Sequence, residues 1–157
     1  MLGRVLSLTE AIKLDTSGTA EVELSDDAIA NEPDEKALAL AMAIANAADD
    51  RKADDISILQ VGDASYIADY FVIATGFTNV QVRAIARSIE ATLETDHGRS
   101  PLRTEGTEEG KWVIYDYGDV IAHIFQPRER EYYDLEAFWG HVQRIEFIPS
   151  PPPGLGQ

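Results

Sequence analysis

The chain of 157 residues contains no cysteine. Disulfide bonds, thiolate-bound zinc, iron–sulfur clusters and a cysteine nucleophile are therefore excluded. No segment approaches the roughly 18 consecutive apolar residues that a membrane-spanning helix needs. The first residues also lack the basic and apolar regions of a secretory signal. We therefore expect no membrane partner and a cytoplasmic location, or an organellar stroma or matrix if the source is eukaryotic.

Positive charge is also scarce. The chain has 13 Lys and Arg residues against 28 Asp and Glu residues, which gives a formal net charge of -15. Neutralised phosphates supply most of the affinity of proteins for bare nucleic acid, so this composition predicts no direct nucleic-acid specificity. A basic protein is the more natural macromolecular partner for such a chain.

The two ends of the chain differ in composition from its middle. Residues 1–35 are rich in carboxylates and hold only short apolar stretches, which predicts an acidic, largely disordered extension. An additional strand or short helix packed on the domain is the alternative. Residues 148–157 are rich in proline and glycine and predict a tail, because proline cannot continue a helix or a sheet ladder. The remaining residues, 36–147, are enough for one domain with its own core.

The first half of this domain shows clear periodicity. A helix is predicted from just after Pro33 to near residues 51–52, and a strand over residues 56–61. Residues 70–75 form an almost unbroken apolar run, which predicts a strand in the middle of a sheet. A second helix is predicted from residue 78 or 79, with Thr78 or Asn79 as its cap, to Gly98, a favourable stop signal.

The second half predicts shorter elements. Residues 102–105 are expected to form a short edge strand. Residues 111–117 and 120–125 predict a hairpin around the turn Gly118–Asp119. One last short helix is expected to place Tyr132, Leu135 and Trp139 on one face, with Phe138 beside them. Helices covering a mixed sheet indicate a two-layer or three-layer α/β domain.

Familiar catalytic motifs are missing from the sequence. We find no phosphate-binding loop, dinucleotide fingerprint, serine elbow or paired-histidine zinc motif. We therefore expect no enzymatic activity, no cofactor and no metal. The less favoured alternative is a metal-dependent nucleotidyl or phosphoryl transferase that uses Asp116, Asp119 and His123, since carboxylates and an imidazole can bind a divalent ion. Asp134 and Glu136 complete the set of candidate ligands.

Large aromatic residues are concentrated in the last third of the chain, where carboxylates alternate with them. Aromatic rings supply contact area in protein interfaces, and surrounding carboxylates select a basic partner. This pattern predicts a protein-binding surface. The alternative explains the same rings as core residues beneath helices on both faces of the sheet.

The same residues resemble a known family. Residues 112–125 (WVIYDYGDVIAHIF) and 130–139 (REYYDLEAFW) are similar to the ribosomal silencing factor (RsfS, or Iojap) family. Residues 54–56, residues 69–76 (DYFVIATG) and the helix from Asn79 agree as well. The resemblance covers about residues 36–140 without large gaps and leaves out both ends.

The resemblance implies a fold and a function. The fold would be a mixed β-sheet flanked by helices, with nucleotidyltransferase-like topology but without the catalytic Asp-x-Asp pair, since Asp116 and Asp119 are spaced D-x-x-D. The implied function is to bind ribosomal protein fourteen of the large ribosomal subunit and to block its association with the small subunit when nutrients are short. A large-subunit maturation factor would need the same surface.

From the residues and the resemblance together we expect a set of contacts with this partner. Leu135 and Trp139 are expected to pack the last helix instead. An exposed edge strand also allows a homodimer. The predicted contacts are Trp112, Asp116, Tyr117, Asp119, Tyr132, Tyr133 and Glu136.

Overall fold

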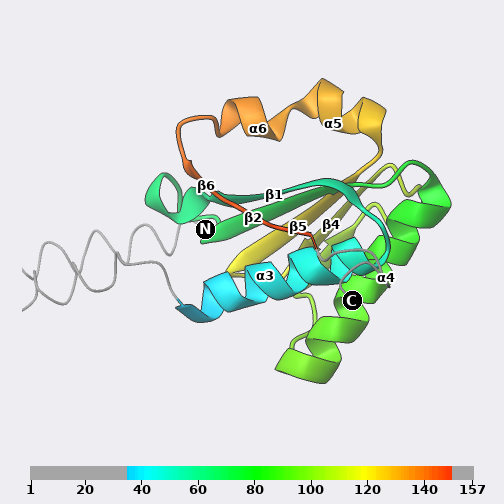
Figure 1. Ribbon diagram of the computed structural model, residues 1–157, viewed down its shortest axis with the longest axis horizontal. Helices are drawn as coiled ribbons and strands as arrows, with labels where there is room; N and C mark the ends of the chain where they lie inside the picture. Colours follow the sequence, from blue (N-terminus) through cyan, green and yellow to red (C-terminus); the bar gives the residue numbers. More distant parts are fainter. Residues whose placement is uncertain (1–34, 150–157) are drawn as a thin grey trace, which may run out of the picture.

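The computed structural model describes residues 35–149. Nearly all of the predicted N-terminal extension and most of the predicted C-terminal tail lie outside these residues. Within them, a six-stranded sheet carries helices on both faces (Figure 1). This arrangement confirms the predicted α/β class with a mixed sheet flanked by helices. None of the helices in residues 35–149 has the length and apolar character that crossing a bilayer requires.

The strands lie in the order β3-β4-β5-β2-β1-β6. β2 and β5 run parallel at the centre, and every other pair of neighbours is antiparallel. All residues of these two central strands are buried, as the apolar run of β2 predicted. β6 was not predicted, because three residues are too few to show a period. The strands are β1 (Asp54–Gln60), β2 (Tyr70–Thr75), β3 (Arg103–Glu105), β4 (Trp112–Asp116), β5 (Val120–Phe125) and β6 (Gln143–Ile145).

Two long helices, α3 (Glu35–Asp50) and α4 (Asn79–His97), pack on one face of the sheet (Figure 1). The buried alanines of α3 allow α4 to approach closely, and both helices contribute to the larger of two apolar cores. The Thr78 hydroxyl accepts a hydrogen bond from the Gln81 amide at 3.0 Å and caps α4. Gly98 ends the helix with a φ of 62°, which glycine adopts without strain. Both predicted ends are confirmed.

The opposite face is covered by two short helices, α5 (Pro127–Tyr133) and α6 (Leu135–Phe138) (Figure 1). The prediction of one continuous helix here is wrong, because Asp134 adopts a φ of 45° and breaks it. The Asp134 carboxylate then accepts a hydrogen bond from the Ala137 amide at 3.4 Å and caps α6. Aspartate tolerates this conformation because its side chain can bond the local backbone. A short 3₁₀ helix, η1 (Val61–Asp63), and the smaller apolar core complete this side.

Candidate docking surface

The β4–β5 hairpin sends its aromatic rings to both faces of the sheet. Trp112 lies toward α5–α6, whereas Tyr115 and Tyr117 lie in the core beneath α3–α4, because successive side chains of a strand alternate between the two faces of the sheet. Tyr117 is only 1% exposed, so the prediction that it contacts a partner is wrong. Burial raises the pKa of Tyr117 and raises that of Tyr115 to about 12. The Tyr115 hydroxyl donates to the Glu90 carboxylate at 3.2 Å.

Asp116 and Asp119 flank the hairpin turn. Gly118 has a φ of 91° at the first central position of this turn, and its amide donates to the Asp116 carboxylate at 2.8 Å. The Asp119 carboxylate forms an ion pair of 2.8 Å with Arg99. Both aspartates are half-buried and lie at the opposite end of β4 from Trp112, roughly 13 Å away along the strand. The structure therefore separates these two carboxylates from the ring of Trp112, and their role as partner contacts stays a prediction.

The α5–α6 layer exposes three large rings, which we call the aromatic face. Tyr132 is 79% exposed, Tyr133 49% and Phe138 73%. Leu135 is half-buried and Trp139 is buried, which confirms that these two residues pack the layer against the sheet. Exposure of Phe138 was not predicted, because one continuous helix would place it beside the packing face. The partly or fully exposed carboxylates on these two helices and at the residue between them are Glu129, Glu131, Asp134 and Glu136.

The half-buried Trp112 supports the aromatic face from below. Its ring lies 4.5 Å, centroid to centroid, from the ring of Tyr133 and 4.8 Å from that of Phe125. The Trp112 indole Nε1 donates a hydrogen bond of 3.2 Å to Nδ1 of His123. These contacts hold the indole in one orientation, so Tyr133 stands on a fixed support.

His123 lies deep beneath this stack. Burial lowers its pKa to about 3, so the imidazole stays neutral at physiological pH. Among residues 35–149, the second ring nitrogen, Nε2, has no hydrogen-bond partner. The neutral ring serves as the acceptor that orients Trp112.

The five residues considered as metal ligands do not come together. Asp119 pairs with Arg99, His123 bonds Trp112, and Asp134 caps α6. Within the described part of the chain, no three histidine, aspartate or glutamate residues form a group that could hold a metal ion.

Glu136 belongs to an internal ion pair. Its two carboxylate oxygens accept hydrogen bonds of 3.0 and 2.7 Å from the guanidinium of Arg130. Burial acts to raise the pKa of Glu136, but the hydrogen bonds and charges of Arg130, Ser57 and Arg144 outweigh it and lower that pKa. The structure gives Glu136 a role inside the layer, and its role as a partner contact stays a prediction. Arg130 was missed, since one arginine among alternating charges leaves no pattern.

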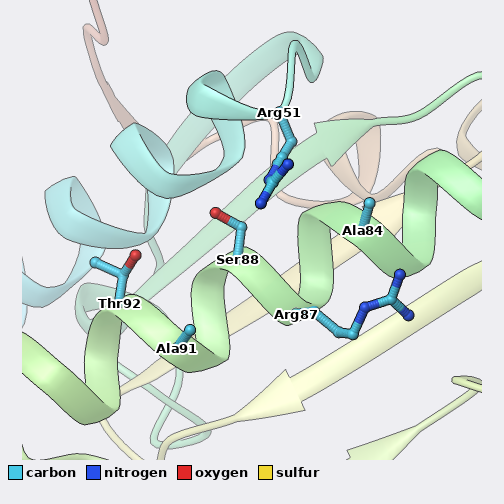
Figure 2. A pocket seen from close by; sticks show the side chains of 6 residues that line it. All are labelled: Arg51, Ala84, Arg87, Ser88, Ala91 and Thr92. Carbon is cyan, nitrogen blue, oxygen red and sulfur yellow. The ribbon is translucent and has the colours of Figure 1, made fainter.

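A hollow of about 480 Å³ lies on the other side of the molecule, over the outer surface of α4 (Figure 2). Arg51 extends over it toward Ser88, whose hydroxyl donates to the Ala47 carbonyl at 3.0 Å. Arg87 extends in a different direction (Figure 2). The two cations do not converge on one point, so the hollow lacks the geometry of a specific ligand site.

A family model described as "Ribosomal silencing factor during starvation" matches residues 34–153. The chain belongs to this family. A ribosomal silencing factor RsfS of Bacillus subtilis is 44% identical over 96 residues, which are 61% of this chain and 80% of the relative. The mouse protein named "Mitochondrial assembly of ribosomal large subunit protein 1" is 30% identical over 89 residues, which are 55% of this chain and 39% of that protein.

The fold agrees with a solved structure. A crystal structure of a protein from Chromobacterium violaceum is similar with a TM-score of 0.61 and 34% sequence identity, and the match covers 76% of this chain and 95% of that protein. The family resemblance inferred from the sequence is thus confirmed. The aromatic face and its support, Trp112, lie within the matched family segment.

Proposed function

We propose that this silencing-factor family member binds the large ribosomal subunit through ribosomal protein fourteen and sterically blocks association with the small subunit. Translation and ribosome assembly are thereby repressed, in the cytoplasm or in an organelle. The observation that carries the proposal is the aromatic face, which exposes three large rings on two short helices. The protein acts without catalysis.

The rings supply the contact area. Exposed aromatic side chains gain roughly 25 cal/mol for each Å² of apolar surface that a partner buries, and interface hot spots are rich in tyrosine and tryptophan. Tyr133 is already held by Trp112, so little side-chain entropy is lost when a partner covers it. A specific complex of this kind buries on the order of 800 Å² per partner.

Charge selects the partner. The exposed carboxylates beside the rings and the net charge of -15 favour a surface of lysine and arginine. Cations can also stack on the exposed tyrosine rings. The same net charge opposes binding to bare ribosomal RNA, which favours a basic ribosomal protein as the partner.

Steric exclusion requires no chemical step. The competing transferase function needs carboxylates that converge on a metal ion. Asp116 instead binds the Gly118 amide, and Asp119 pairs with Arg99. These local engagements favour a binding function over a transferase.

A second candidate function is large-subunit maturation. The name of the mouse relative refers to assembly of the large ribosomal subunit, and the same aromatic face would serve a maturation factor. Maturation differs from silencing in one respect, since it does not require that subunit joining is blocked.

A subunit-association assay tests the proposal. Purified protein added to separated subunits is expected to lower the fraction of joined ribosomes in a sucrose gradient. The double variant Tyr132→Ala/Phe138→Ala is expected to lose this effect, whereas Val80→Ala, which truncates an exposed apolar side chain on α4, is expected to retain it. Normal joining in the presence of bound wild-type protein would contradict silencing and favour maturation.

A further inference from the structure

The helices α5 and α6 themselves bury little apolar surface, since Leu135 is only half-buried and the buried Trp139 follows α6. α5 has seven residues and α6 has four, and isolated helices of this length do not form in water. The residue of α5 that is buried is Arg130, and α6 has no buried residue. The order of the layer therefore depends on contacts with the sheet.

Arg130 makes most of the polar contacts between this layer and the sheet. Its Nη1 donates to the Asp55 carbonyl at 2.6 Å and to the Thr75 hydroxyl at 2.8 Å, and its Nη2 donates to the Ser57 hydroxyl at 3.1 Å. The same guanidinium binds both oxygens of Glu136 on α6. One buried side chain thus joins α5, α6 and the adjacent ends of β1 and β2.

The backbone of the sheet is shaped to meet this guanidinium. The β1–β2 register shifts between Asp54 and Ser57, and Asp55 within this irregularity has a φ of 48°. Such a conformation is unfavourable for a residue with a side chain and persists only where its surroundings hold it. The carbonyl of Asp55 itself accepts the shortest of the Arg130 hydrogen bonds.

We propose that Arg130 is a clasp, a positioning residue that attaches the α5–α6 layer to the sheet, and that the layer opens as a unit when the clasp is removed. The expected effect on docking rests on the proposed function, whereas the attachment of the layer by Arg130 does not. The aromatic face then binds the large subunit only while the layer is attached. If the layer is attached in a tenth of the molecules, the apparent affinity falls about tenfold.

The test uses the full chain with Arg130→Met and the milder Glu136→Gln, which keeps the shape of the side chain and removes its charge. Arg128→Met is the matched control, because Arg128 is an exposed arginine on the same helix. Arg130→Lys is expected to keep only part of the binding to large subunits that Arg130→Met loses. A single ammonium cannot bridge Glu136 and the sheet as a guanidinium does.

Two measurements report on the layer itself. Hydrogen exchange follows the amides of residues 127–139 separately from those of β2 and α4. Tryptophan emission is equally local, because the two tryptophans of the chain, Trp112 and Trp139, both lie in the smaller core. Arg130→Met is expected to speed exchange over residues 127–139 and to shift the emission to longer wavelength, while exchange in β2 and α4 is unchanged.

Co-sedimentation with large subunits supplies the third measurement. We expect binding about tenfold weaker or worse for Arg130→Met, a smaller loss for Glu136→Gln, and none for Arg128→Met. Unchanged exchange over residues 127–139 in Arg130→Met, or an equal loss of protection in β2 and α4, would overturn the clasp. Failure of the wild-type protein to bind large subunits would contradict the proposed function. Hydrogen exchange and tryptophan emission would still test whether Arg130 attaches the α5–α6 layer to the sheet.

Discussion

The helices of the α3–α4 face are long, and their buried residues are all apolar, whereas the helices of the α5–α6 face are short and bury an arginine. The first face contains the larger core of the molecule. The second face leaves three large aromatic rings in solvent and orders them through a buried ion pair and an indole–imidazole contact.

This difference indicates that the α3–α4 face mainly stabilises the fold, whereas the α5–α6 face mainly serves binding. Burial of side chains that are mostly apolar holds the α3–α4 face against the sheet, and the tyrosines Tyr115 and Tyr117 are part of the same core. The α5–α6 face leaves its aromatic rings exposed to a partner and therefore buries less apolar surface. Directional polar contacts, those of Arg130 and Trp112, offset the stability that this lost burial would supply. Binding residues are often carried in this way by less stable segments on a rigid scaffold.

The largest effect on stability is expected on the α3–α4 face. Leu93 on α4 is fully buried, so Leu93→Ala removes apolar contacts and leaves a cavity. We expect the free energy of unfolding to fall by about 3 kcal/mol, measured by urea denaturation. Leu102→Ala, at a position 77% exposed, is the control and should change stability by less than about 0.5 kcal/mol. Equal effects of the two substitutions would refute the assigned core.

The next largest effect concerns binding and is expected on the other face. Tyr133→Ala removes a half-exposed ring from the aromatic face, and Trp112→Ala removes the support of that ring. Each is expected to cost roughly 2 kcal/mol of affinity for large subunits, measured by co-sedimentation over a range of concentrations. Tyr133→Ala should leave the unfolding midpoint nearly unchanged, whereas Trp112→Ala should lower it. Wild-type affinity in both variants would contradict the assigned surface.

The ends of α4 and the faces of the β4–β5 hairpin could be predicted because their signals are local. Thr78, Gly98 and the turn at Gly118 each act through the neighbouring backbone. The placement of Tyr117 in the core depends on α4, which covers that face, so alternation alone could not decide whether its ring was accessible.

The clasp could not be predicted for a different reason. Arg130 and Ser57 are 73 positions apart and meet only through the tertiary structure. The break at Asp134 was also missed, because a single aspartate in a helical pattern does not show that its backbone adopts a left-handed conformation. Tyr132 and Tyr133 are exposed, as a contact requires, and burial of Tyr117 excludes that residue as a contact. The roles of Tyr132, Tyr133 and Glu136 as contacts stay predictions.

The smallest effect is a dependence of stability on pH that arises beneath Trp112. The pKa of His123 is lowered to about 3 in the folded protein, whereas an unfolded histidine titrates near 6.5. Below pH 6.5 the unfolded state therefore takes up a proton that the folded state does not, and stability falls with acidification. Between pH 7 and pH 5 this site should remove between about 1 and 2 kcal/mol. Urea denaturation of the wild type and His123→Gln at both pH values should show a smaller loss in the variant. An equal loss in both would contradict the buried neutral imidazole.

The most direct test of the account is a hydrogen-exchange footprint of the protein bound to purified large subunits. We predict that residues 127–139 gain protection on binding, while the outer surface of α4 around Arg51 and Arg87 exchanges as in the free protein. Protection over α4 with no change in residues 127–139 would contradict the assignment of the α5–α6 face as the docking surface.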